Sequence, residues 1–190
     1  MDADGLTFAC AMTVEERAAR RLGPTALVGL GVSRGVPESE RLVSFGIAGA
    51  LRGDLPVGTV IDATRVVDET GSVLWEGGPL GVAPARTGTI LGAGRIVDDP
   101  SERARLHEQT GADAVDMESG TLARSGRLAG CIRAISDTPT SKLAGLAEAV
   151  TLSGEPDVLG FLRGFVREPV VTLRAALGAR RALKSLEGLA

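Results

Sequence analysis

Two carboxylates follow apolar segments in the most informative stretch of this sequence. Glu118 comes directly after the apolar segment 112–117, and Asp137 comes just after the apolar segment 131–135. Carboxylates at such positions can accept hydrogen bonds, stabilise positive charge, or donate a proton when burial holds them partly neutral. The two acids therefore predict a ligand site, although their types alone do not identify the ligand.

The elements expected around these acids are a strand, a helix and a second strand. Residues 112–117 predict a strand, and a helix is expected to begin at Glu118 and to run to about Arg127. Residues 131–135 predict a buried strand that ends before Pro139, because proline cannot continue the ladder of hydrogen bonds. In open α/β sheets ligands bind beyond the carboxyl ends of the strands, which is where both acids would lie.

Four sequence blocks, in a fixed order, resemble the nucleoside phosphorylase and methylthioadenosine/S-adenosylhomocysteine nucleosidase superfamily. They are AMTVEE (11–16), SFGIAGAL (44–51) with VGTV (57–60), VDMES (115–119) and RAISD (133–137). The resemblance covers most of residues 6–140. It implies a three-layer α/β/α sandwich with a central mixed β-sheet, and an enzyme that cleaves the N-glycosidic bond of an adenine nucleoside.

Within that superfamily the sequence most closely resembles the hopanoid-associated phosphorylases, which act on adenosylhopane. The features that carry this resemblance are the compact length, RIVDDPSE (95–102), the AVDMES form of the central motif (114–119), and a long tail with REP (167–169). It implies phosphorolysis of adenosylhopane with release of adenine. Two alternatives stay open: a hydrolytic methylthioadenosine or S-adenosylhomocysteine nucleosidase, and a nucleoside-binding protein without catalytic activity.

Asp137 is the expected general acid. Breaking an N-glycosidic bond builds positive charge on the ribose, while the purine departs with negative charge unless it is protonated. We expect Asp137, held partly neutral by desolvation and supported by Ser136, to donate a proton to purine N7. The alternative is a turn-capping aspartate, since Asp-Thr-Pro is favourable turn chemistry.

The resemblance assigns two further acids to the site. It places Glu118 on the ribose 2′- and 3′-hydroxyls, with Met117 against the sugar face, and it places Glu15 where nucleosidases carry the glutamate that activates the attacking water. The alternatives are helix N-terminal acids for both glutamates and core filling by Met117, while Arg133 can be structural.

The glycine-rich block and the segment at Arg95 are the remaining candidates for substrate contacts. We expect Gly46, Ala48 and Gly49 to line the substrate site, and the backbone of Arg95 and Ile96 to contact the adenine edge. Nucleosidases stack the purine on an aromatic residue near position 95, and here the Arg95 guanidinium would take that role. The alternative is an ordinary surface arginine.

The sequence does not decide whether phosphate or water attacks the sugar. Related phosphorylases carry an arginine and a serine where this chain has Ser44 and Ile47, so the usual phosphate site is altered. Gly31 and Arg34 are candidate phosphate ligands, since phosphate sites use backbone N–H groups and cationic side chains. Phosphate is a candidate co-substrate, and no cofactor or metal ion is expected.

Composition narrows the class of partner. A net charge of −3 and a pI near 5.3 argue against a nucleic-acid binder, so the expected partner is a small molecule. Cys10 and Cys131 lie in apolar segments and predict buried reduced thiols, and His107 is expected at the surface. No apolar stretch reaches membrane-spanning length and no basic leader is seen, which predicts a cytoplasmic protein. The family resemblance suggests a homo-oligomer.

Strand-like runs alternate with helical or glycine-rich connections, which favours an α/β fold with one domain over residues 1–190. The expected strands are 6–12, 26–30, 42–45, 59–67, 88–91, 112–117 and 131–136. Residues 71–87 predict a short loop where nucleosidases carry more chain, so we expect an open pocket.

The C-terminal tail, at about 156–188, is expected to form two helices, 156–167 and 169 to about 186. From Asp157 onward the chain carries six cations and three acids, a net charge of +3 against −6 for the rest. A cationic amphipathic segment can bind an anionic membrane surface, which predicts peripheral membrane association through the tail. The alternative is a helix that packs on the domain or on a second subunit.

Overall fold

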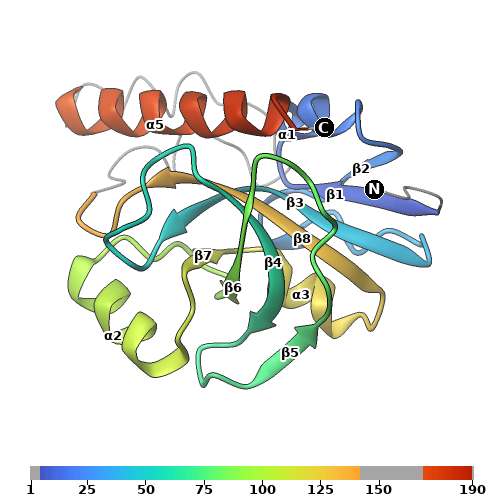
Figure 1. Ribbon diagram of the computed structural model, residues 1–190, viewed down its shortest axis with the longest axis horizontal. Helices are drawn as coiled ribbons and strands as arrows, with labels where there is room; N and C mark the ends of the chain where they lie inside the picture. Colours follow the sequence, from blue (N-terminus) through green and yellow to red (C-terminus); the bar gives the residue numbers. More distant parts are fainter. Residues whose placement is uncertain (1–4, 142–168, 190) are drawn as a thin grey trace.

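The computed structural model describes residues 5–141 and 169–189, which form a central β-sheet with helices on both faces (Figure 1). Helices α1 (Thr13–Ala19) and α5 (Pro169–Glu187) lie on one face, whereas α2 (Pro100–Thr110) and α3 (Ser119–Arg124) lie on the other. The predicted α/β/α architecture is confirmed. The helix expected at 156–167 lies outside the described residues.

The described sheet is mixed and partly closed on itself. Its strands are β1 (Leu6–Cys10), β2 (Thr25–Leu27), β3 (Arg41–Ala50), β4 (Val60–Val67), β5 (Val73–Glu76), β6 (Arg86–Gly92), β7 (Ala114–Asp116) and β8 (Leu128–Asp137). The strand order is β2-β1-β3-β7-β6-β4-β5, and β8 pairs with both β3 and β4. The strands β3, β8, β4, β6 and β7 therefore form a closed ring, with β1 and β2 extending from one side and β5 from the other.

The sequence blocks come together at the C-terminal end of β3. β3 pairs in parallel with β8, so that Gly49 lies beside Asp137, and it pairs antiparallel with β7, so that Gly49 also lies beside Val115. The blocks SFGIAGAL, VDMES and RAISD thus meet at one end of β3. Parallel β1 adds the AMTVEE block, because the loop after Cys10 leads directly into α1.

Several element boundaries differ from the prediction. β3 continues through its glycines and alanines to Ala50, rather than ending at Phe45, because β8 supplies hydrogen bonds along the whole length. The segment 71–87, predicted as a loop, contains β5, which pairs with β4 beyond a tight turn at Asp68 and Gly71. The strand predicted at 26–30 ends at Leu27, because the chain bends at two glycines with positive φ and forms the short helix η1 (Leu30–Val32).

The predictions for the cysteines, the histidine and the end of one helix had different outcomes. Cys10 and Cys131 are buried free thiols, as expected. His107, predicted at the surface, is partly buried, and its Nδ1 lies 2.7 Å from the Ala112 carbonyl oxygen. The helix predicted from Glu118 to Arg127 is shorter, because Gly126 adopts a left-handed conformation (φ 72°) and turns the chain into β8.

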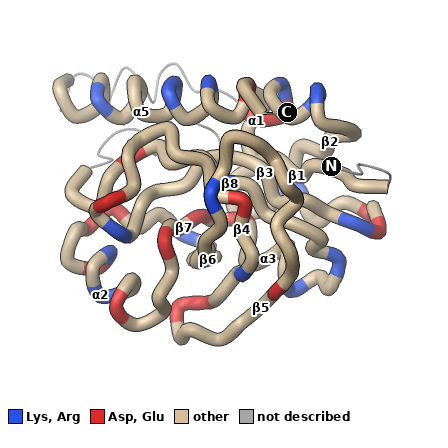
Figure 2. Tube along the Cα trace, in the orientation of Figure 1, with Lys and Arg blue, Asp and Glu red and all other residues tan. Residues whose placement is uncertain are grey.

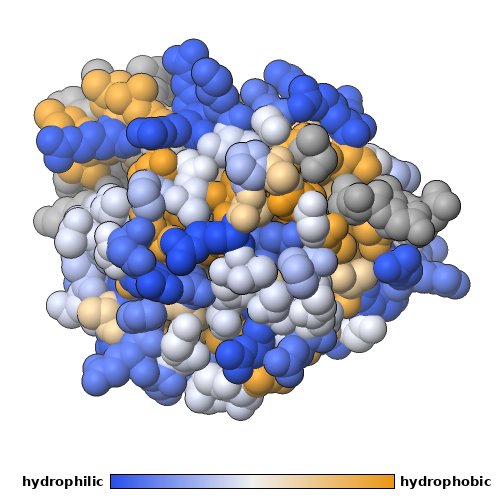
Figure 3. Space-filling view, in the orientation of Figure 1, coloured by the Kyte–Doolittle hydropathy of each residue, from blue (hydrophilic) through white to orange (hydrophobic). Residues whose placement is uncertain are grey.

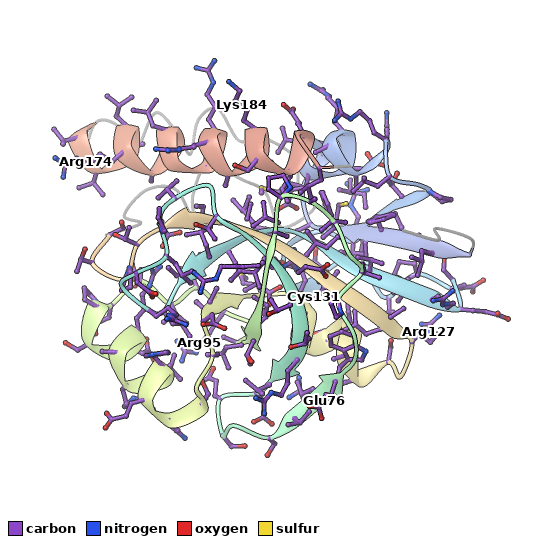
Figure 4. The ribbon with its side chains drawn as sticks, viewed as in Figure 1. Glu76, Arg95, Arg127, Cys131, Arg174 and Lys184 are labelled. Atoms are coloured by element: carbon purple, nitrogen blue, oxygen red, sulfur yellow. The ribbon has the colours of Figure 1, made fainter. Side chains whose placement is uncertain are left out.

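The helix predicted from 169 to about 186 is present as α5, and it packs closely on β8. Gly178 makes this approach possible, because a Cβ atom there would overlap the Ser136 carbonyl oxygen. Cationic segments lie along the helix in Figure 2, and Lys184 extends from it away from the sheet in Figure 4. Among the described residues, no helix has both the length and the hydropathy needed to cross a membrane.

Candidate active site

One pocket of about 280 Å³ collects the three acids that the sequence singled out. Glu15 enters it from α1, Glu118 from the start of α3, and Asp137 from the end of β8. All three are buried, with at most 5% of each residue exposed. The rest of the lining is largely apolar and includes Met12 and Leu183, so the acids act in a region of low polarity.

Glu15 is held by the backbone. Its Oε2 accepts a hydrogen bond from the Met12 N–H and its Oε1 accepts one from the Ile47 N–H, each at 2.9 Å. Burial raises the pKa of Glu15, against the opposing effect of the Arg133 charge and of these backbone hydrogen bonds. A carboxylate with a raised pKa is a stronger base, which suits it to take a proton from an attacking water molecule.

Glu118 lies at the N-terminus of α3 and points back across the pocket floor. Its Oε1 accepts a hydrogen bond from the Gly31 N–H at 2.9 Å, and its Oε2 lies 3.7 Å from Arg133 Nη2. Burial raises the pKa of Glu118 to about 8, with Arg133 lowering it and the charges of Asp116 and Glu15 raising it further. The carboxyl group is thus able to exchange hydrogen bonds with sugar hydroxyls near neutral pH.

Asp137 is enclosed, as predicted, but a guanidinium that sequence analysis missed lies against it. Arg103 Nη1 donates to Asp137 Oδ2 at 2.5 Å, and Ser136 Oγ donates to Asp137 Oδ1 at 2.6 Å. The sequence led us to expect only an apolar environment around Asp137. The structure adds a buried positive charge to that environment. The predicted support from Ser136 is seen as a direct hydrogen bond.

Beneath the pocket, Arg133 organises a second polar group. Its guanidinium is 1% exposed and forms an ion pair with Asp116, while Nη2 donates to Ser44 Oγ at 2.6 Å. Ser119 joins the same group through Asp116. Ser44 stands where related phosphorylases carry an arginine, and here its hydroxyl is used to hold Arg133.

One side of the pocket is built from the segment before α2. Arg95 and Ile96 both line the pocket, as predicted. The Arg95 side chain is 42% exposed, and Ile96 as a whole residue is 40% exposed. The Arg95 guanidinium forms ion pairs with Glu69 at 3.0 Å and with Glu102 at 2.8 Å. It lies beside α2 in Figure 4. These ion pairs already occupy the group that was expected to stack on a purine.

Four of the other predicted site residues line the pocket, whereas Gly46 lies outside its lining and makes room for two charged side chains. Ala48, Gly49, Met117 and Ser136 line the pocket. Gly46 does not; its missing side chain leaves room for Glu15 and Arg133, both of which a Cβ atom would overlap.

The two candidate phosphate ligands also lie outside the pocket lining. The Gly31 N–H is taken by Glu118, and Arg34 is not among the lining residues. Their role as phosphate ligands stays a prediction.

Arg103 and Asp116 are the residues that sequence reasoning did not connect to the site. Arg103 was one of several charged residues in a polar helix, and only packing reveals that it shares the inner face of α2 with Leu106. The spacing of three residues between them was the available signal, because residues i and i+3 lie on one helix face.

Comparisons with known proteins agree with this architecture. Residues 76–155 match the sequence profile of the Phosphorylase superfamily. No curated protein sequence matches the chain.

Solved structures give whole-chain matches at low identity. A mutant of the Helicobacter pylori enzyme MTAN with 5′-methylthioadenosine in its active site matches with a TM-score of 0.55 at 16% identity, over 95% of this chain and 96% of that one. The Campylobacter jejuni 5′-methylthioadenosine/S-adenosyl homocysteine nucleosidase gives 0.55 at 18%, over 96% and 98%. Futalosine hydrolase of H. pylori gives 0.55 at 16%, over 95% and 96%. These similarities show the fold. The profile match over residues 76–155 agrees with the superfamily that the motifs predict.

Proposed function

We propose that this protein hydrolyses the N-glycosidic bond of an adenine nucleoside and releases adenine. The observation that carries the proposal is the convergence of Glu15, Glu118 and Asp137 in one apolar pocket. These three acids cover the requirements of the reaction: activation of the nucleophile, binding of the sugar and protonation of the leaving group.

In the proposed reaction the bond between C1′ and purine N9 breaks, and its electron pair leaves with the purine. Asp137 gives its proton to N7, so that adenine departs as a neutral molecule. Water adds to C1′ and loses its proton to Glu15, whose raised pKa favours that uptake. Glu118 holds the ribose hydroxyls and shares the positive charge of the ring, an effect that is larger in a dry site than in water.

Water is favoured over phosphate as the nucleophile by the surroundings of Glu15. Its carboxylate occupies the N–H groups of Met12 and Ile47, which are the kind of backbone donor that a phosphate oxygen requires. A carboxylate there would also repel the incoming anion. Ser44, at the position of the phosphorylase arginine, is turned toward Arg133.

Phosphorolysis of adenosylhopane is the second candidate function. The apolar surfaces of the pocket and of α5 favour it, whereas the catalytic groups do not. The pocket includes Val14, Leu30 and Leu183, and α5 carries exposed Leu173 and Leu177 on its outer side. Such surfaces suit a large apolar substituent on the ribose 5′ carbon and a substrate that resides in a membrane.

Adenine release measured with and without phosphate tests both candidates. The purified protein is incubated with methylthioadenosine, S-adenosylhomocysteine and adenosylhopane, and free adenine and the sugar product are quantified. We expect adenine and the free sugar at the same rate in both conditions, and no release by Asp137→Asn. A sugar phosphate as product would establish phosphorolysis, and no adenine from any of the three substrates would overturn the proposed function.

A further inference from the structure

Arg103 is a buried guanidinium for which the proposed reaction has no role. It is 1% exposed and, with Leu106, forms the buried face of α2. The other charged side chains of this helix are at least partly exposed; Arg105, two residues further on, is 57% exposed at the side chain. Burial of a lone charge is costly, so a buried arginine must find acceptors.

Its four acceptors come from three separate segments that frame the pocket. Nη1 donates to Asp137 Oδ2 at 2.5 Å, to the Thr138 carbonyl at 2.9 Å and to the Ala50 carbonyl at 3.4 Å. Nε donates to the Val97 carbonyl at 2.8 Å. One guanidinium therefore joins the ends of β3 and β8 to the segment before α2.

Val97 connects the hydrogen bonds of Arg103 to the residues that line the pocket. Val97 follows Arg95 and Ile96, which line one side of the pocket, and Arg95 is itself bonded to Glu102 in the first turn of α2. Helix α2 thus holds this side of the pocket and the acid at fixed separation. Proton transfer from a carboxyl group to a purine nitrogen depends on this separation, because a misplacement of about 1 Å can cost on the order of 100-fold in rate.

The charge of Arg103 adds a second effect. When Asp137 gives up its proton, a carboxylate forms in a region of low polarity, and the guanidinium already in contact stabilises it. This stabilisation is greatest after transfer has begun, so it lowers the barrier rather than strengthening the binding of substrate.

We propose that Arg103 is a positioning residue for catalysis, which orients Asp137 against the purine and stabilises the carboxylate left after protonation. The proposal rests on the proposed function. Gly49 belongs to the same arrangement, because a Cβ atom there would lie 3.0 Å from both Arg103 Nη2 and Asp137 Oδ2 and would crowd the pair.

The test is the separate measurement of kcat and KM for adenine release by wild type, Arg103→Met, Arg103→Lys and Gly49→Ala. Arg105→Met, an exposed change on the same helix, is the matched control. Because the Arg103 contacts act on Asp137 and not on the nucleoside, their loss should lower kcat while KM stays within about twofold of wild type. For Arg103→Met we expect a fall in kcat of roughly 10- to 100-fold from lost orientation.

The other variants separate charge from geometry. Arg103→Lys keeps the charge but not the planar fork of donors, so it should recover part of the kcat that Arg103→Met loses. Gly49→Ala keeps both partners and should lower kcat through crowding, and Arg105→Met should match wild type. A purely structural arginine would lower the melting temperature of both Arg103 variants without a selective loss of kcat.

The outcomes are distinct. If Arg103→Met folds, as judged by circular dichroism, and keeps the wild-type kcat, the positioning role is wrong while the proposed function stands. If it does not fold, Arg103→Lys and Gly49→Ala decide, and wild-type kcat in both overturns the role. If wild type itself releases no adenine, the proposed function fails and this role falls with it.

Discussion

Arg133 faces more acids than a single guanidinium can neutralise. It is paired with Asp116, Glu118 lies 3.7 Å away, and its charge also acts on Glu15. Burial raises the pKa values of both glutamates, and the Arg133 charge lowers them without cancelling that rise. The structure thus keeps Glu15 able to take up a proton where the proposed reaction needs it.

Glu118 should make folding stability depend on pH. Its pKa is raised from 4.5 to about 8, so between these values the folded state binds more protons than the unfolded state. The free energy of unfolding must then fall as pH rises from about 5 to about 8, by an amount on the order of a few kcal/mol. Urea denaturation across this range should show a smaller fall for Glu118→Gln, which cannot ionise.

The control for this experiment is Glu108→Gln, an exposed change on α2. It should leave the pH dependence of wild type unchanged. A fall in stability that is as large in Glu118→Gln as in wild type would show that other groups cause it.

At the residue scale, sequence reasoning found the acids and missed their partners. Glu15, Glu118 and Asp137 stand in motifs whose order along the chain is specific, and the structure brings them into one pocket. Arg103 has no such motif, because its burial depends on how α2 packs against the ends of β3 and β8. That packing is a long-range contact between positions 34 residues apart, which local patterns do not encode.

At the element scale, small residues decide how closely the layers approach. Gly46 leaves space for Glu15 and Arg133, and Gly92 of β6 packs so closely on α3 that a Cβ atom would overlap the backbone of Gly120. The alternation of apolar residues predicted most strands, but it could not predict the full length of β3. Its glycines and alanines have weak strand propensity, and pairing with β8 overrides that preference.

Gly178→Ala should destabilise the protein, although alanine is the better helix former. Alanine normally stabilises a helix interior by about 0.5–1 kcal/mol relative to glycine. Here its Cβ atom would overlap the Ser136 carbonyl oxygen, so α5 must move away from β8. We expect a net loss of about 1–3 kcal/mol in the free energy of unfolding, together with slower adenine release, because α5 contributes Ala179 and Leu183 to the pocket.

Thermal and urea denaturation measure the effect of this substitution. Leu177→Ala changes the neighbouring position, which is 55% exposed, and should stay within about 0.5 kcal/mol of wild type. A more stable Gly178→Ala variant would show that α5 tolerates displacement from the sheet.

At the scale of the whole molecule, α5 connects the pocket with the outer surface. Ala179 and Leu183 face the pocket, while exposed Val170, Leu173 and Leu177 lie on the opposite, outer part of the helix. Hydrophobic atoms gather at the start of α5 on the face shown in Figure 3, next to hydrophilic ones. A helix with these two sides can serve both as a wall of the site and as a contact surface.

Peripheral binding of α5 to an anionic membrane is the expectation for that surface. Leu173 and Leu177 share a helix face with Arg180 and Lys184, so apolar side chains would enter the interface while cations bind lipid headgroups. Each cation near an anionic surface contributes about 1 kcal/mol, and each inserted leucine about 1.5–3 kcal/mol. The protein should therefore sediment with phosphatidylserine vesicles, less so with neutral phosphatidylcholine vesicles, and less as salt screens the charges.

The double change Leu173→Ser with Leu177→Ser should lower the fraction bound to anionic vesicles by at least about tenfold, because it removes most of the apolar contribution. Val73→Ser is the matched control, since Val73 is 49% exposed on β5, away from α5. Equal binding by the double variant and wild type would mean that charge alone holds the protein to the vesicles. Absence of wild-type binding at low salt would instead leave the outer side of α5 to a protein partner, such as a second copy of this chain.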